Sequence, residues 1–307
     1  MKRRDFLKWQ VAGLGLLGVN APLLAVAEKV FDGPPLPDVA VAKGSPGPAT
    51  RAAVNQIGGM TRFVKPGQKV VIKPNMSFAR GPESAVNTHP EVIGELLVMC
   101  REAGAGKILV LDHVLQDPEL CLGRSGIRDI CNAFQPGICH NLAAESFFVE
   151  ADLPQAAEMR TNAFMRDVLE ADVIIAAPVA KSHSAAGVSL SLKGQMGLIY
   201  DRRVMHSRYD LSTSIVDLAE RVKPHLAVID ATRVLATNGP GGPGNVIQPG
   251  EVIASADPVA ADATAVTSYE WYGRKIQPRQ VQHLRLAHQR KLGRMDIEAL
   301  VTKRVTA

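Results

Sequence analysis

Short apolar runs alternate with helix-like segments along most of the chain. Runs such as 70–72, 108–111 and 173–177 are continuously apolar, without the alternation of a half-exposed strand. Continuous runs of this kind are typical of strands buried on both faces of a parallel sheet. Several of the segments between them begin with Pro or end at Gly, as helices often do. The pattern predicts a layered α/β fold with a mostly parallel central sheet and helices on both faces.

The expected elements follow one another from residue 38 onward. The expected strands are 38–44, 69–72, 107–112, 172–178, 226–231 and 251–256. The expected helices are 49–59, 90–104, 125–134, 163–170, 211–222 and 258–269, with a basic helical tail from Pro278. The passage from 135 to about 160 gives no clear pattern. We expect residues 38–307 to form a single α/β domain, and a division into two subdomains stays open.

The first 27 residues have a different character. Arg3 and Arg4 precede a Phe-Leu-Lys sequence, an apolar run follows from Val11 to Leu24, and Ala25-Val26-Ala27 offers small residues for cleavage. This order is typical of a secretory signal peptide, and the apolar run is short for a membrane span. The paired arginines resemble a twin-arginine signal. We therefore expect export by the twin-arginine translocase, a periplasmic or otherwise exported location, and a proline-rich spacer at 28–37.

Composition and charge exclude two classes of partner. The 307 residues are 46% hydrophobic and 21% charged, whereas only 5% are aromatic, which argues against a surface that stacks on bases. Loss of residues 1–27 removes four basic residues and one acidic residue and lowers the net charge from +5 to +2. Such a chain offers no extended positive surface to nucleic acid. No second apolar run is long enough to span a bilayer.

Polar residues gather where the expected strands end. Lys73 and Asn75 follow one strand, and Lys181 and His183 follow another. The carboxyl ends of parallel strands form the ligand crevice of such folds. Lys193 comes next, within a stretch rich in Ala, Gly and Ser, where backbone N–H groups can approach a ligand closely.

These features predict a site for a small anion of the carboxylate or phosphate class. The candidate ligand-binding residues are Lys73, Asn75, Lys193, His206, Asn238, Gly239 and Gly241. His183 and Lys181 are the candidate catalytic residues. Histidine has an ordinary pKa near neutrality, which suits proton transfer. The glycine-proline loop at 238–242 matches neither the dinucleotide nor the P-loop motif.

Two metal sites are conceivable on residue type. Asp257 and Asp262 could hold a divalent metal that bridges to the anion, although Asp257 before Pro258 also fits a helix cap. Of the four cysteines, none forms a Cys-x-x-Cys pair, so buried thiols or one disulfide are favoured. In the alternative interpretation, a metal or an iron–sulfur cluster is held by Cys121, Cys131, Cys139 and His140.

Six segments together resemble a known family, the domain of unknown function 362. In chain order these are VVIKPNMS, NTHPEV, DVIIAAPVAKSHSAAGVSLSLKGQMGLI, AVIDA, NGPGGPG and VIASADPVAADATA. The resemblance marks Lys73, Asn75, Lys181, His183, Lys193, the 238–242 loop, Asp257 and Asp262, but it implies no settled reaction.

Members of this family often carry twin-arginine signals, and some are fused to ferredoxin-type modules. This chain lacks a four-cysteine ferredoxin segment, and it has Gly194 where the lysine segment of relatives often continues with Asn.

Three functions stay open at this point. The first is an exported protein that binds a small anion, as an enzyme or as a binding protein. The second is a periplasmic redox, iron–sulfur or metal-cofactor protein. The third is a non-catalytic accessory or assembly protein. The residues at the strand ends favour the first.

Overall fold

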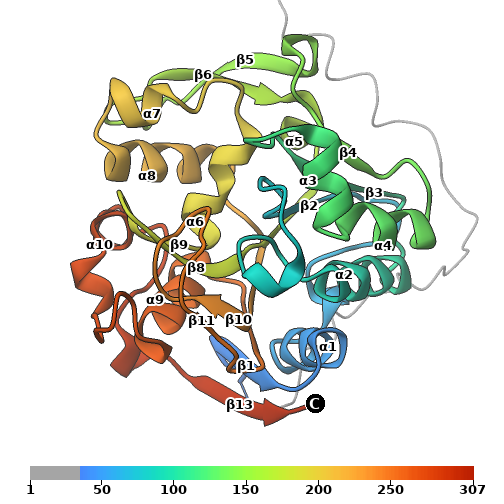
Figure 1. Ribbon diagram of the computed structural model, residues 1–307, viewed down its shortest axis with the longest axis vertical. Coiled ribbons are helices and arrows are strands. Elements are labelled where there is room, and N and C mark those ends of the chain that lie inside the picture. Colours follow the sequence, from blue (N-terminus) through green and yellow to red (C-terminus); the bar gives the residue numbers. More distant parts are fainter. Residues whose placement is uncertain (1–34) are drawn as a thin grey trace, which may run out of the picture. The chain divides into compact units, whose positions relative to one another are not determined.

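A mostly parallel sheet runs through the protein and orders all other elements around it (Figure 1). The computed structural model describes residues 35–307, and the predicted signal peptide lies outside this range. The strand order is β13-β1-β12-β10-β7-β2-β3-β4. The strands are β1 (Val39–Lys43), β2 (Lys69–Pro74), β3 (Lys107–Asp112), β4 (Cys139–Asn141), β7 (Val173–Ala177), β10 (Leu226–Leu235), β12 (Glu251–Ser255) and β13 (Thr302–Thr306).

The direction of the strands matches the sequence prediction. The pairs β10–β7, β7–β2, β2–β3 and β3–β4 are parallel, whereas β12 is antiparallel to both β1 and β10. All five residues of β7 and all ten of β10 are buried. Burial on both faces explains why β7 is apolar without alternation. Strand β10 is equally buried but also carries the polar residues Asp230, Thr232 and Arg233. The α/β fold with a mostly parallel sheet is confirmed.

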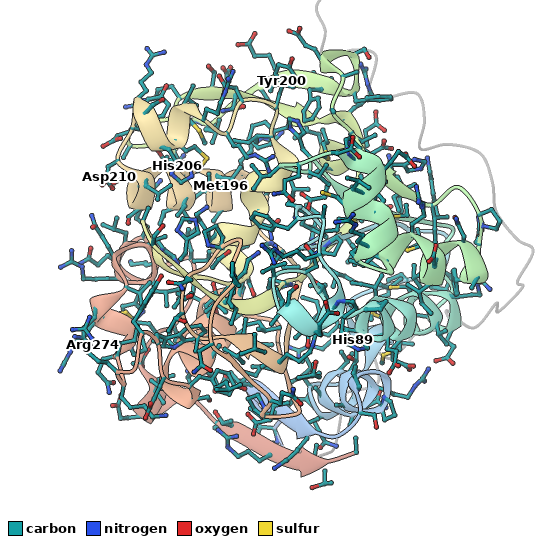
Figure 2. All side chains as sticks on the ribbon, in the orientation of Figure 1. His89, Met196, Tyr200, His206, Asp210 and Arg274 are labelled. Carbon is teal, nitrogen blue, oxygen red and sulfur yellow. The ribbon has the colours of Figure 1, made fainter. Side chains whose placement is uncertain are left out.

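A small second layer covers the carboxyl ends of the strands. After Pro178 the chain forms β8 (Val179–His183), which pairs with β10 and with β9 (Gly187–Ser189). Next come α6 (Ser191–Gly194), the 3-10 turn η5 (Gln195–Leu198) and α7 (Val204–Ser207). Figure 2 shows Met196 of η5 near His206 of α7 in this layer. The segment that carries the predicted lysines thus lies over the strand ends.

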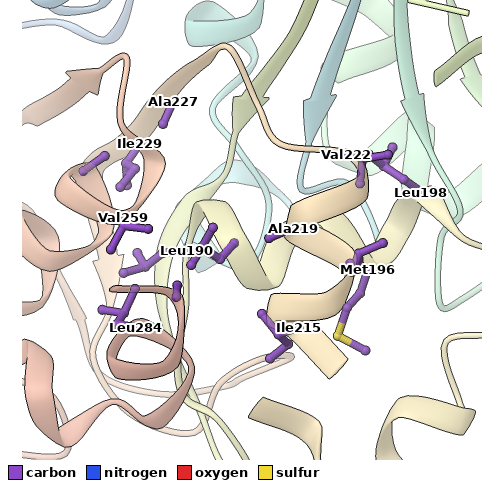
Figure 3. Packing of buried hydrophobic residues seen from close by; sticks show 14 of the residues in the cluster. Leu190, Met196, Leu198, Ile215, Ala219, Val222, Ala227, Ile229, Val259 and Leu284 are labelled. Carbon is purple, nitrogen blue, oxygen red and sulfur yellow. The ribbon is translucent and has the colours of Figure 1, made fainter. Parts of the chain in front are cut away.

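Two hydrophobic cores fill the two faces of the sheet. One face is covered by α1 (Pro46–Gln56), α2 (Pro90–Glu102) and α4 (Ile127–Phe134). The other is covered by α8 (Leu211–Arg221), α9 (Pro258–Ser268) and α10 (Gln282–Gln289). Figure 3 shows part of this second core, in which Val259 and Leu284 lie beside Leu190. Residues 36–307 form one compact unit.

The structure corrects the sequence prediction in three places. Residues 161–165 form strand β6, paired with β5 (Phe148–Asp152), and only α5 (Arg166–Leu169) is helical. Phe164 and Met165 pair with the preceding strand β5 and are completely buried, and these contacts override the helical pattern. Helix α3 (Pro118–Arg124) was not predicted. The tail ends in β13 at the edge of the sheet, not in a helix.

Short elements complete the fold. They are β11 (Val246–Ile247) and the 3-10 turns η2 (Met60–Arg62), η3 (Pro82–Ser84), η4 (Glu145–Phe147), η6 (Pro278–Gln280) and η7 (Ile297–Ala299). Within residues 35–307, no helix combines the length and the apolar character needed to cross a bilayer.

Candidate anion-binding site

A cavity of about 420 Å³ lies at the ends of β2 and β3, beneath the second layer. Six of the residues predicted from sequence line it: Lys73, Asn75, Lys181, His183, Lys193 and His206. They come from β2 and the residue that follows its end, and from β8, α6 and α7, so the strand ends and the covering layer supply them together. The structure therefore brings these distant positions to one cavity.

The floor of the cavity is a buried ion pair. The Lys73 Nζ lies 3.0 Å from Oδ1 of Asp112, and both side chains are almost completely buried. The other carboxylate oxygen of Asp112 accepts hydrogen bonds from the Ser77 hydroxyl at 3.0 Å and the Met76 N–H at 3.3 Å. A Cβ on Gly197 would lie 2.0 Å from Asp112 Oδ1, so the pair fits only because residue 197 has no side chain.

Lys181 extends into the cavity from strand β8. Its Nζ donates to the Val86 carbonyl at 2.7 Å and lies 5.0 Å from the centre of the Phe78 ring. Burial and repulsion from Lys73 lower the pKa of Lys181 to about 7. Asn75 holds this strand in place, because its Oδ1 accepts a hydrogen bond from the Val179 N–H at 3.1 Å.

Lys193 enters from the short helix α6. Both oxygens of Asp262, on α9, accept hydrogen bonds from this turn, from the N–H groups of Ser191 at 2.8 Å and Leu192 at 3.0 Å. Asp262 therefore fixes the backbone that carries Lys193. Burial, with repulsion from Arg202 and Lys73, lowers the pKa of Lys193 to about 7. Burial raises the pKa of Asp262 to about 7.

Positive charge exceeds negative charge in this cavity. Arg202 adds a half-buried guanidinium, whose NH2 group donates to the Val114 carbonyl at 2.9 Å. Among residues 35–307, neither Lys181, Lys193 nor Arg202 forms an ion pair, while Asp112 is paired with Lys73. Buried cations without a counter-charge are costly. The arrangement can therefore bind an anion that supplies the missing charge.

His183 has a fixed tautomer. Its Nδ1 accepts hydrogen bonds from the N–H groups of Ala185 at 3.1 Å and Ala186 at 3.2 Å, so a neutral ring carries its proton on Nε2. Burial, followed by repulsion from Lys193 and His206, lowers the pKa of His183 to about 3. The pKa near neutrality that the sequence suggested does not hold here. His183 is a neutral N–H donor, and its ring lies parallel to that of His206, at 9° and 6.1 Å between centres.

The glycine-proline loop contacts the cavity at Pro240 and is otherwise structural. Gly239 N–H donates to the Ser182 hydroxyl at 3.0 Å, and a Cβ at this position would lie 1.8 Å from the Ser182 carbonyl oxygen. Asn238 Nδ2 donates to the Pro243 carbonyl at 3.1 Å, and Gly241 packs on Phe78. Asn238, Gly239 and Gly241 hold the loop in place and do not line the cavity.

The predicted metal ligands have other partners. Asp257 caps α9, since its Oδ1 accepts from the N–H groups of Val259 at 2.8 Å and Ala260 at 3.0 Å. Asp257 and Asp262 both lie outside the cavity lining. Throughout the part of the chain that the structure describes, no three His, Cys, Asp or Glu residues are arranged to hold a metal. The set of Cys121, Cys131, Cys139 and His140 therefore does not form a metal site in this structure. All four cysteines are free thiols.

Sequence reasoning left two important residues unassigned. Asp112 ends strand β3, next to the end of β2, and parallel pairing places it beside Lys73. Arg202 stands four residues before His206 in the same basic segment, and this spacing was the available signal. The ion pair of Asp112 with Lys73 and the position of Arg202 in the cavity lining both depend on the tertiary fold.

Comparisons with known proteins give one family match and one curated relative. The model of the family "Domain of unknown function (DUF362)" matches residues 70–267. A thylakoid-associated protein of Synechocystis sp. is 27% identical over 233 residues, which cover 69% of this chain and 66% of that protein.

Two solved structures are similar at low identity. The lactate racemase apoprotein from Thermoanaerobacterium thermosaccharolyticum has a TM-score of 0.48 and 13% identity, over 77% of this chain and 59% of that one. A protein from Thermotoga maritima has a TM-score of 0.45 and 14% identity, over 73% and 59%. The chain thus spans less than two thirds of the length of these proteins. Since the family model matches more than half of its residues, the chain belongs to the family Domain of unknown function (DUF362).

Proposed function

We propose that this protein binds a small anionic molecule, of the carboxylate or phosphate class, in the cavity between the strand ends and the second layer. One observation carries the proposal. Lys181, Lys193 and Arg202 line one cavity in which, among residues 35–307, the single carboxylate is Asp112, already paired with Lys73. Two opposite unit charges about 4 Å apart attract by about 4 kcal/mol at an effective dielectric constant of about 20. An anion that meets two or three of these cations therefore gains substantial binding energy.

Binding of an anion must also change protonation. Without a ligand, Lys181 and Lys193 each have a pKa of about 7, so a large fraction of each is neutral just above neutrality. A nearby negative charge raises the pKa of an ammonium group. The protein therefore takes up protons as the anion binds. This linkage separates binding in the cavity from binding at exposed lysines, which are already charged.

The same groups favour proton transfer as a second candidate function. A lysine with a pKa of about 7 is present in both protonation states at neutral pH and suits general acid–base catalysis. His183 complements it as a neutral donor from Nε2. Once a substrate is identified, we expect the His183→Ala variant to lose turnover and to keep most of its affinity for the anion. Unchanged turnover would remove His183 from the mechanism.

Export remains part of the proposal on the basis of the first 27 residues. The paired arginines, the apolar run and the Ala-Val-Ala sequence support the twin-arginine route and an exported location. Replacement of both Arg3 and Arg4 by Lys should leave the protein in the cytoplasmic fraction. Export that continues without the arginine pair would contradict this route.

Calorimetric titration tests anion binding directly. Phosphate, acetate and succinate are titrated into the wild type, the Lys193→Met variant and the Lys303→Met variant, which changes an exposed lysine on β13. We expect the wild type and Lys303→Met to bind at least one anion alike, and Lys193→Met to bind it about tenfold more weakly or worse, a loss of about 1.4 kcal/mol or more. Equal affinity of all three proteins, or no binding by the wild type, would refute the proposed function.

A further inference from the structure

A second cavity adjoins the anion-binding cavity. It has a volume of about 330 Å³, and Leu115, Arg202 and Arg203 line both cavities. Arg202 thus stands in the wall between them. A ligand that places its anionic group near Arg202 can extend directly into this second space. The second cavity contains none of the buried lysines, so its chemistry differs from that of the first.

Aromatic rings form a wall of the second cavity. The rings of His113 and Tyr200 are nearly parallel, at 11° with centres 6.0 Å apart. Phe148 supports both rings in tilted contacts at 5.7 and 5.2 Å. The backbone of Tyr200 is held by a hydrogen bond from its N–H to the Ala163 carbonyl at 2.8 Å. The ring of Tyr200, labelled in Figure 2, thus packs against both His113 and Phe148.

This aromatic wall is incompletely covered. Tyr200 is 36% exposed, and Leu115, which lines both cavities, is 56% exposed. The Arg203 side chain is 93% exposed, and its Nε lies 3.6 Å from Oδ1 of Asp201. A planar ring fits such a wall best, because aromatic rings stack with an offset on one another and the flat guanidinium stacks on ring faces. A flexible aliphatic group would gain burial without this stacking.

We infer that the second cavity receives an aromatic or heteroaromatic ring of the same ligand whose anionic group lies among Lys181, Lys193 and Arg202. This inference rests on the proposed function and extends it, because it names the ligand class as a ring-bearing anion. Tyr200 provides the stacking surface, Leu115 packs on the edge of the ring, and Arg202 contacts both parts of the ligand.

Paired probes with the same anionic group test the inference. Phenyl phosphate and methyl phosphate are each titrated into the full-length protein by calorimetry. We expect phenyl phosphate to bind the wild type about tenfold more tightly, since ring stacking and apolar burial add to the same phosphate contacts. In Tyr200→Ala and Tyr200→Leu the two probes should bind within about twofold of each other, with methyl phosphate unchanged. Tyr200→Leu keeps apolar packing on Phe148, which guards against loss of folding.

Tyr272→Ala serves as the control, because Tyr272 is 39% exposed and lines neither cavity. This variant should keep the wild-type preference. If methyl phosphate binds but phenyl phosphate binds no more tightly, the inference is wrong and the proposed function stands. If both probes weaken equally in Tyr200→Leu, Tyr200 has only a structural role and the inference is also wrong. If neither probe binds the wild type, the proposed function fails and the inference fails with it.

Discussion

Replacement of Lys193 by Met should stabilise the ligand-free protein while it weakens anion binding. Lys193 is only 8% exposed, and in the part of the chain that the structure describes it has no carboxylate partner. Met has a similar length and no charge, so it fills the same space without the cost of a buried ammonium. A gain in stability at a polar site is unusual, since most substitutions destabilise. Such a gain is expected at a buried charged residue whose role is to bind a ligand, because its charge is unpaired when the ligand is absent.

The magnitude follows from the pKa of Lys193. The ammonium has a pKa of 10.5 in the unfolded chain and about 7 in the folded protein. Below pH 7 both states are protonated, and the buried charge then costs about 5 kcal/mol. Between pH 7 and 10.5 the unfolded state binds more protons, so the wild type becomes more stable as the pH rises. Near pH 9 the remaining cost is about 2 kcal/mol.

Urea unfolding near pH 6 and near pH 9 measures this effect. We expect Lys193→Met to exceed the wild type in free energy of unfolding at both values, with a gain about 3 kcal/mol larger near pH 6. Lys303→Met, which alters an exposed lysine, should match the wild type at both. A destabilised Lys193→Met protein, or a gain that does not change with pH, would refute the view of Lys193 as an uncompensated buried cation.

Three further predictions concern the same cavity. Lys181 and Lys193 have pKa values of about 7 that a bound anion raises, so affinity for the anion should fall as pH rises from 7 to 9. Calorimetry in two buffers of different ionisation enthalpy should show proton uptake on binding. Zero uptake would contradict this prediction. Gly197→Ala should cost about 1–3 kcal/mol in urea unfolding and weaken binding, because its Cβ would lie 2.0 Å from Asp112 Oδ1. Gly194→Ala, whose Cβ would meet nothing nearer than 3.8 Å, should be nearly neutral, and similar losses in both variants would argue against this packing. Asp262→Ala should lose about 1–3 kcal/mol and also anion affinity, because it frees two buried N–H groups in the turn before Lys193; unchanged affinity would limit Asp262 to a purely structural role.

The sequence predicts the sheet well because its strands are short apolar runs that need no knowledge of their partners. The residues 70–72 and 173–177 fall in β2 and β7 as expected. The first part of the helix expected at 163–170 was wrong, because β6 is stabilised by pairing with β5, which a local pattern does not show; only Arg166–Leu169 is helical. The same limitation applies to the edge strand β13, which depends on β1.

The site shows the same division between local and tertiary information. The rule that ligands bind at carboxyl ends of parallel strands was enough to select Lys73 and Lys181, and both line the cavity. The pairing of Asp112 with Lys73 and the pKa of His183 depend on neighbours and burial that only the fold supplies. Asp257 is next to Pro258 in a local capping pattern, and the structure places it in that role.

The most direct measurement is the titration of individual lysines by NMR, with ¹³C-labelled lysine and with Lys181→Met and Lys193→Met spectra for assignment. In the ligand-free protein, two lysine signals should titrate near pH 7, and saturating phosphate should raise both pKa values by about one or more. If every lysine titrates near 10.5, or if phosphate leaves the two low pKa values unchanged, the claim that unpaired buried lysines in this cavity bind an anion is wrong.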